Sequence, residues 1–182
     1  KRFLNKIYFA SDLHLGVPNR EESLKREKLF VQWLEKIKSD AEAIYLLGDI
    51  FDFWFEYKKV VPKGYVRVLG KLAEISDKGI PIHIFTGNHD MWLFDYIESE
   101  INAHIYREPI HIYLKGKHFY IGHGDGMGPG DKVYKIVKKI FQNKLCQWLF
   151  ERVHPNLGIS IAQYWSKKSR IANTKNDRIY FG

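Results

Sequence analysis

Acidic, amide and imidazole side chains recur in this chain directly after short apolar runs. One set stands at Gly87-Asn88-His89-Asp90, just beyond the strand-like run 80–85. Three more sets follow similar apolar runs. The first contains Asp12 and His14, the second contains Asp49, and the third contains His123. Oxygen and imidazole donors of this kind are metal ligands. Because ligands of open α/β sheets bind just beyond the carboxyl ends of strands, we expect these side chains to converge on one metal centre.

The spacing within each set supports this interpretation. Asp12 and His14 are two residues apart, so on an extended segment they point the same way and can hold one ion together. A lone Asp-x-His is more often a turn aspartate beside a surface histidine, and only the later sets reverse that balance. Gly48 before Asp49 and the glycine-rich stretch 122–130 allow backbone to lie close to a ligand.

The residues between these sets predict alternating strands and helices. The amphipathic stretches favour helices because their apolar residues recur at helical spacing, whereas apolar residues alternate after residue 103 and predict a hairpin. We expect strands at 7–10, 43–47, 80–85 and 119–121, crossover helices at 21–38 and 62–78, and a turn at 115–117. This order predicts an α/β fold with a mixed sheet.

An aromatic segment follows the second of these strands. Residues 51–55 hold four aromatic side chains, which fit a buried core and a substrate cleft about equally well. Asp52 within this segment is more consistent with supporting a ligand or capping the loop than with binding a metal directly.

Composition limits the classes of protein that the chain can represent. Its 182 residues fit one domain with a sizeable core, and no apolar run approaches the roughly 18 residues that a membrane span needs. The single cysteine, Cys146, cannot form a disulfide within the chain, and no leader-like apolar stretch follows Lys1-Arg2. The single cysteine favours a reducing compartment.

The positive charge is concentrated in residues 131–170. This stretch carries nine lysines and arginines against two acidic residues, or +7 of the total charge of +8. Its apolar residues keep helical spacing, which predicts a basic amphipathic helical insertion. Such helices suit a membrane surface or a lipid substrate, and nucleic-acid binding is the rival interpretation. A helical hairpin packed on the domain, with its lysines in water, is the third interpretation, since runs of charge usually face solvent.

Taken in order, these motifs resemble those of the calcineurin-like metallophosphoesterases. The segment 48–54, the His123-Gly124-Asp125 element and the basic insertion are most similar to the branch of that family that acts in lipid A biosynthesis. The resemblance implies an αββα sandwich of two mixed β-sheets that carries a helical insertion and two divalent metal ions, usually Mn²⁺. It also implies a core over residues 1–130, an insertion over 131–170 and a return to the core over 171–182.

The resemblance assigns roles to individual residues. It places Asp12 and His14 on one metal, Asp49 between the two metals, and Asn88 and His123 on the second. His89 should act near the phosphate as an acid or electrostatic stabiliser, while Asp90 orients the turn. The lipid branch can have arginine at the position of His89, so the histidine is a departure toward the general family pattern. The implied substrate-binding residues are Asn88, His89, Asp131, Ser166 and Arg170.

One family element has no counterpart in the sequence. The family pattern ends in Gly-His-x-His, which supplies one ligand to each metal, whereas after His123 this chain has only His154, within His-Pro-Asn. We therefore expect the C-terminal part of the fold to be missing, together with two metal ligands. Weakened metal affinity is the predicted consequence.

The resemblance also implies a reaction and its location. Two divalent ions polarise a phosphoryl oxygen and activate water, which would hydrolyse the pyrophosphate of a nucleotide-linked glycolipid. The protein would then act in the cytoplasm, peripherally at the inner-membrane surface, and no nucleic-acid partner is expected. Two alternatives remain: a metallophosphoesterase for other phosphodiesters or nucleotides, which detergent-dependent activity would distinguish, and a non-catalytic scaffold, which Mn²⁺ binding would distinguish.

Overall fold

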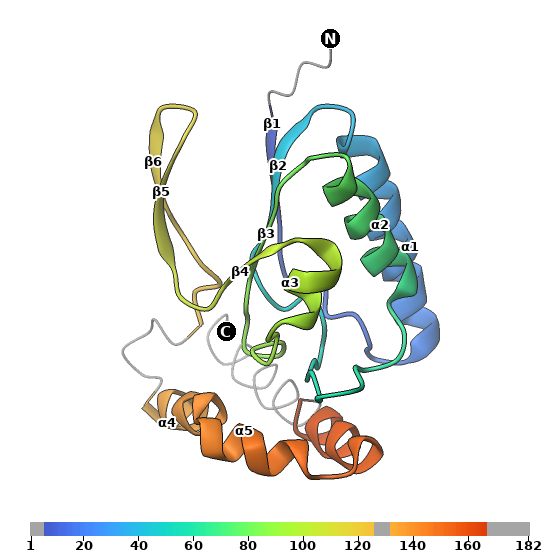
Figure 1. Ribbon diagram of the computed structural model, residues 1–182, viewed down its shortest axis with the longest axis vertical. Helices are drawn as coiled ribbons and strands as arrows, with labels where there is room; N and C mark the ends of the chain where they lie inside the picture. Colours follow the sequence, from blue (N-terminus) through green and yellow to red (C-terminus); the bar gives the residue numbers. More distant parts are fainter. Residues whose placement is uncertain (1–5, 126–131, 167–182) are drawn as a thin grey trace, which may run out of the picture.

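The protein is built around a parallel sheet with helical crossovers, as a computed structural model shows for residues 6–125 and 132–166 (Figure 1). The sheet has the order β1 (Lys6–Ala10), β2 (Ala41–Leu46), β3 (Ile82–Phe85) and β4 (His104–Tyr106), all parallel. The crossovers are α1 (Arg20–Ile37), α2 (Val66–Asp77) and the short α3 (Tyr96–Ile101). Because every strand runs the same way, all four carboxyl ends meet at one edge.

Local sequence signals set the bounds of the two long helices. Asn19 caps α1 by accepting a hydrogen bond from the Glu22 backbone N–H at 3.0 Å, so this helix begins where the sequence predicts. The second helix starts at Val66, four residues later than expected. Gly64 (φ 118°) and Tyr65 (φ 58°) both hold left-handed backbone before it, which is incompatible with an earlier helical turn.

The parallel sheet is buried on both faces. In β2, Ile44 and Leu46 pack into the core beneath α1 and α2, whereas Ala43 and Tyr45 face the opposite side. There they meet the hairpin of β5 (Ile110–Leu114) and β6 (Lys117–Ile121). Figure 1 shows this hairpin standing across from the sheet, on the side away from the helices.

The layers are therefore helices, sheet and facing hairpin, which confirms the predicted α/β class. The sequence predicts mixed sheets, but within residues 6–125 and 132–166 each sheet is of a single kind. The first stays parallel because α3 returns the chain for β4, and the hairpin strands pair antiparallel with each other.

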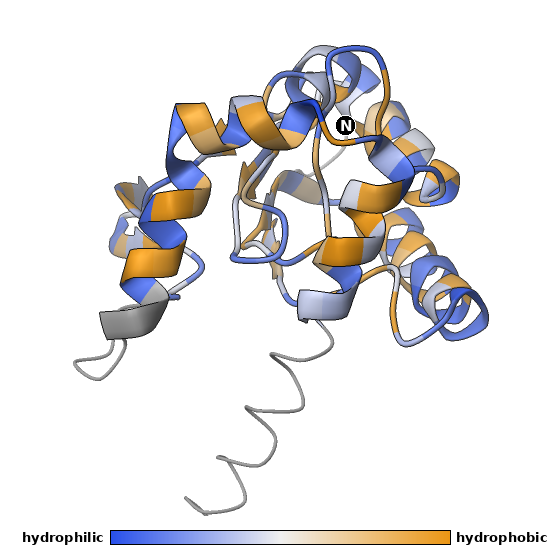
Figure 2. Cartoon of the chain, turned by 90° about the horizontal axis from the view of Figure 1, so that it is seen from below, coloured by the Kyte–Doolittle hydropathy of each residue, from blue (hydrophilic) through white to orange (hydrophobic). Residues whose placement is uncertain are grey.

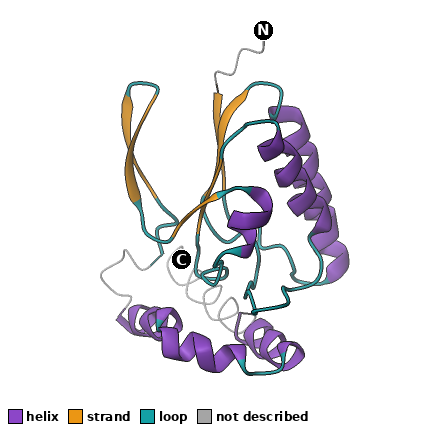
Figure 3. Ribbon diagram, in the orientation of Figure 1, coloured by secondary structure: helices purple, strands orange, loops and turns teal. Residues whose placement is uncertain are grey.

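Helices of the insertion lie across the edge where the parallel strands end (Figures 1 and 3). They are α4 (Lys132–Gln142), α5 (Lys144–Glu151) and a helix at residues 155–166. Phe141 and Phe150 pack there against Phe55 and Trp92 of the core, and the Trp92 indole N–H donates to the Phe141 carbonyl at 2.8 Å. Figure 2 shows apolar and polar residues alternating along these helices. None of the described helices is long and apolar enough to cross a membrane.

Candidate metal centre and adjoining cavity

The loops after β1 and β2 hold their acidic and imidazole side chains on unusual backbone. Asp12, His14 and Asp49 have φ of 55°, 42° and 53°, a region that non-glycine residues seldom occupy and that concentrates at functional sites. Backbone hydrogen bonds tie the loops together, among them those from Asp12 N to the Gly48 carbonyl (3.1 Å) and from His14 N to the Asp49 carbonyl (2.9 Å). The strained loops thus fix one another.

Asp49 lies at the centre of the site. It is buried, and its Oδ2 is 3.7 Å from His14 Nε2 and 3.5 Å from His123 Nε2. Asp49 belongs to two groups of three whose ligand atoms all lie within 4.8 Å of one another: with His14 and His89, and with Asp12 and His123. Burial raises the pKa of Asp49, but hydrogen bonding and charge from His123 and His89 outweigh it and lower the pKa overall.

Asn88 and His123 lie together beside Asp49. The His123 Nε2 atom is 3.3 Å from Asn88 Oδ1, and its Nδ1 is 2.8 Å from the Leu47 carbonyl oxygen, which can only accept. Nδ1 therefore carries hydrogen, and Nε2 is the atom directed at Asp49. Burial lowers the pKa of His123, yet the Asp49 carboxylate raises it to about 9.

The residues fit a divalent metal. Asp12, Asp49 and Asn88 offer oxygen donors and the histidines offer imidazole nitrogens, the donor set of Mn²⁺ and Zn²⁺ sites. The buried Nδ1 of His14 has no hydrogen-bond partner within the described part of the chain. His14 Nε2 is 3.8 Å from Asp12 Oδ1, so the two residues predicted to share an ion are adjacent.

Asp90 organises the two loops that carry these ligands. Its side chain is fully buried and accepts from the backbone N–H groups of Gly87 (2.8 Å), Asp49 (3.2 Å), Ile50 (2.8 Å) and Phe51 (3.4 Å). Burial and the Asp49 charge raise the pKa of Asp90 to about 6. The residue predicted to orient the turn therefore also positions the loop of Asp49.

Ser166 of the insertion reaches the core at Asp52 and His89. Its hydroxyl lies 3.0 Å from Asp52 Oδ2 and 3.3 Å from His89 Nδ1. His89 Nδ1 is also 2.9 Å from the Asp52 carbonyl oxygen, so this nitrogen carries hydrogen. The sequence indicates a supporting role for Asp52 but gives no sign of its contact with the insertion. That contact joins residues 114 positions apart.

A cavity of about 330 Å³ opens from these residues into the insertion. At the site it is lined by Asp52, Asn88, His89 and Ser166. Its other walls are mainly apolar and include Phe53, Trp92, Phe141, Phe150, Ile161 and Trp165. The sequence suggested either a buried core or a substrate cleft for the aromatic segment after β2. Both are found, because Phe51 and Trp54 lie in the core while Phe53 lines the cavity.

Two predicted substrate residues, Asp131 and Arg170, lie outside the described residues, as does the predicted return to the core at 171–182. Two residues that the sequence did not single out lie beside the site. Trp92 lines the cavity, and its position two residues after Asp90 of the Gly-Asn-His-Asp turn could have drawn attention to it. Lys138 pairs with Asp125 at 2.7 Å, a contact that no spacing predicts.

The chain belongs to the calcineurin-like phosphoesterase family, whose family model matches residues 5–175. UDP-2,3-diacylglucosamine hydrolase of Porphyromonas gingivalis is 44% identical over 172 residues, which cover 94% of this chain and 66% of that protein. The enzymes of the same name from Histophilus somni and Actinobacillus succinogenes are each 30% identical, over 71% and 73% of their lengths. The chain thus spans about two thirds of the length of these relatives.

Proposed function

We propose that this protein is a di-metal hydrolase that cleaves the pyrophosphate of UDP-2,3-diacylglucosamine. Water would attack one phosphorus and the bond between the two phosphates would break, giving UMP and 2,3-diacylglucosamine 1-phosphate. The observation that carries the proposal is the joining of the Asp49-centred donor cluster to an apolar cavity. Family membership and the names of the relatives support it.

Asp12, His14, Asp49, Asn88 and His123 would hold the two ions, for which Mn²⁺ is the proposed metal. When bound, divalent ions of this kind polarise a phosphoryl oxygen and lower the pKa of water. Asp49 would contact both ions, a role that its membership of both groups of possible ligands supports. Asp90 would keep its two loops in register while charge builds up at the site.

His89 is the candidate acid or electrostatic stabiliser. Its backbone N–H donates to Asp49 Oδ1 at 2.9 Å, and its Nδ1 faces Asp52, so its other ring nitrogen is the one available to substrate in the cavity. Ser166 shares this contact, which links the position of the insertion to that of the catalytic histidine.

The apolar cavity would hold the acyl chains. A mainly apolar lining with a few polar groups at one end suits a lipid whose phosphate lies at the metal centre. The outer side of the insertion exposes Leu145, Trp148 and Leu149 beside basic residues, which supports peripheral binding to the inner membrane from the cytoplasm.

The test is Mn²⁺-dependent release of UMP from UDP-2,3-diacylglucosamine by the full-length protein in detergent. We expect release that a chelator stops and that added Mn²⁺ restores. Hydrolysis of a generic phosphodiester with no cleavage of the glycolipid would reject the substrate and keep the metal site. Absence of Mn²⁺ binding would reject the catalytic assignment altogether.

A further inference from the structure

Arg26 of α1 reaches the loop that carries Asp12 and His14. Its half-buried side chain donates to three backbone carbonyls of that loop: Nε to Leu13 at 3.2 Å, and Nη2 to His14 at 2.9 Å and to Val17. One guanidinium can serve several acceptors at once, because its five N–H donors point in fixed directions. The loop after β1 is therefore held by α1 as well as by the loop after β2.

The two peptide groups on either side of His14 are held at both ends. On the N–H side, His14 and Leu15 donate to carbonyls of the loop after β2, both at 2.9 Å. On the carbonyl side, the oxygens of Leu13 and His14 both accept from Arg26. Since peptide groups are planar, the orientations of these two groups set the φ and ψ of the residue between them. Arg26 thus helps to fix the left-handed backbone of His14, whose φ is 42°.

The ring of His14 depends on this backbone more than the other imidazoles of the site depend on theirs. The Nδ1 atoms of His123 and His89 lie 2.8 and 2.9 Å from backbone carbonyl oxygens. The buried Nδ1 of His14 has no hydrogen-bond partner among the described residues. Metal-binding histidines are usually oriented by a hydrogen bond at the second ring nitrogen. The direction of the His14 ring is therefore set by its backbone and by its packing against the His89 ring.

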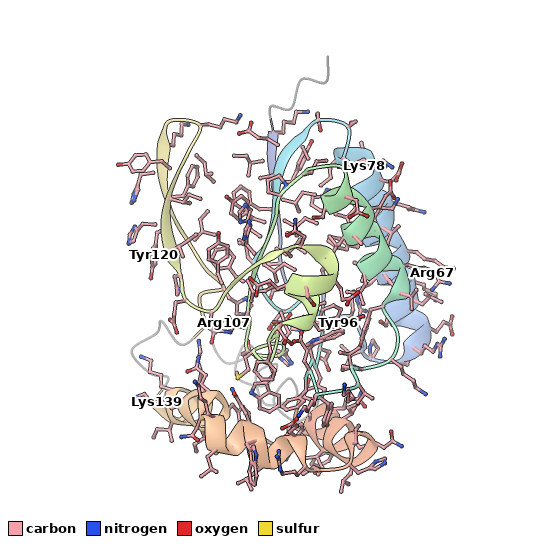
Figure 4. All side chains as sticks on the ribbon, viewed as in Figure 1. Arg67, Lys78, Tyr96, Arg107, Tyr120 and Lys139 are labelled. Carbon is pink, nitrogen blue, oxygen red and sulfur yellow. The ribbon has the colours of Figure 1, made fainter. Side chains whose placement is uncertain are left out.

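Two neighbours of Arg26 on α1 hold the same framework. The buried Ser23 accepts from the Gly16 backbone N–H at 2.7 Å, in the same loop. The buried Glu27 accepts from the backbone N–H of Arg67 at 3.0 Å. Figure 4 labels Arg67 near the start of α2. These contacts fix the helix from which Arg26 donates.

We propose that Arg26 is a positioning residue for the metal ligand His14, acting through the backbone on either side of that histidine. This role rests on the proposed function only in taking the cluster around Asp49 as a metal site, and it does not depend on the substrate. Lysine would keep the charge but not the planar arrangement of donors, so it should replace Arg26 only in part.

Calorimetric titration of Mn²⁺ into the full-length protein tests this role. We expect the dissociation constant of Mn²⁺ to rise about tenfold in Arg26→Met and by less in Arg26→Lys. Arg26→Lys keeps the charge, so it reports on affinity even if Arg26→Met does not fold. Arg20→Met is the matched control, because Arg20 is exposed at the start of the same helix, and its Mn²⁺ affinity should equal that of the wild type.

A double-mutant cycle shows whether Arg26 acts through His14. In the His14→Ala background, Arg26→Met should cause no further loss of Mn²⁺ affinity. An equal loss with and without His14 would mean that Arg26 supports the whole fold, which overturns the positioning role. Nuclear magnetic resonance of the metal-free protein gives a second readout. Arg26→Met should shift the ring signals of His14 and leave those of His123 in place, and unmoved His14 signals would also overturn the role.

Glycolipid hydrolysis separates this proposal from the proposed function. Unchanged Mn²⁺ affinity in Arg26→Met and Arg26→Lys overturns the positioning role even when the glycolipid is cleaved. A loss of affinity that requires His14 supports the role even when the glycolipid is not cleaved, and that result rejects only the proposed function. A wild type that binds no Mn²⁺ rejects both.

Discussion

The core at the strand ends buries its charged and aliphatic side chains, whereas the helical insertion leaves many of its apolar side chains exposed. Around Asp49 and Asp90 the charged groups are buried and hydrogen-bonded, and the aliphatic residues beneath them are sealed by α1 and α2. In the insertion, Trp148 and Leu145 are 49% and 64% exposed, and α5 has no buried residue. Within the described residues, the parallel sheet and its helices bury most of their apolar side chains, whereas the insertion leaves many of its own exposed.

This contrast separates two sources of function. Strain and buried hydrogen bonds fix the chemistry at the strand ends, and such features need a stable scaffold. Among the described residues, the insertion contacts that scaffold through an aromatic cluster, the Lys138–Asp125 ion pair and Ser166, so we expect it to open at a lower free energy than the core. Catalysis and substrate capture should therefore respond separately to mutation.

The largest expected effect comes from removing the charge of Asp49. Asp49→Asn keeps a residue that tolerates the left-handed backbone but weakens both donor groups, so we expect turnover to fall by about three orders of magnitude or more. Asp77→Asn, at an exposed carboxylate on α2, should leave turnover unchanged. Initial rates with matched circular dichroism spectra are the measurement, and full activity of Asp49→Asn would exclude the metal mechanism.

Replacing one large side chain by alanine in each region should separate effects on stability from effects on substrate binding. Leu46→Ala in the core should lower the free energy of unfolding by about 2–5 kcal/mol, because it leaves a cavity between the sheet and its helices. Phe150→Ala removes a ring from the aromatic cluster beside the apolar cavity, so we expect KM for the glycolipid to rise about tenfold with little loss of global stability.

Leu149→Ala is the control for Phe150→Ala, because its side chain is half exposed and lines no part of the apolar cavity. Denaturant unfolding and steady-state kinetics on all three variants make the comparison. Equal loss of global stability in Leu46→Ala and Phe150→Ala would show that core and insertion fold as one unit.

The substitution Gly87→Ala should disturb the candidate metal centre, because it adds a methyl group beside Asp49. A β-carbon there would overlap the Asp49 carboxylate and its backbone nitrogen, so we expect weaker Mn²⁺ binding and a loss of about 1–3 kcal/mol of stability. Gly70→Ala is the matched control, because Gly70 lies in α2 with open space around it and alanine favours helix. Calorimetric titration of Mn²⁺ tests both, and unchanged affinity in Gly87→Ala would mean that the loop adjusts freely.

Sequence patterns predicted the parts of the molecule that local rules determine. Alternating and helical periodicities predicted β1, β2, β3, the hairpin and the long crossover helices, and the motif order predicted that the Asp, His and Asn side chains meet at one edge of the sheet. The prediction for the start of the alternating region was wrong, because residues 104–106 form β4 of the parallel sheet and not a strand of the hairpin. Contacts between distant segments were not predictable in this way. Neither the hydrogen bond from Ser166 to Asp52 nor the packing of Phe150 against Phe55 has a local signature, because each depends on how the insertion packs on the core.

The smallest effect expected for a single side chain concerns the charge of the insertion. If its outer face binds the inner membrane, neutralising Lys139 and Lys144 should weaken binding to vesicles that contain anionic lipid, by about fivefold for each lysine. Lys58→Gln and Lys59→Gln remove the same charge from an exposed loop of the core and should have no effect. Vesicle sedimentation at two salt concentrations measures the change. Equal losses from both pairs would mean that net charge alone drives binding, and the insertion would then differ from the core in shape but not in its relation to the membrane.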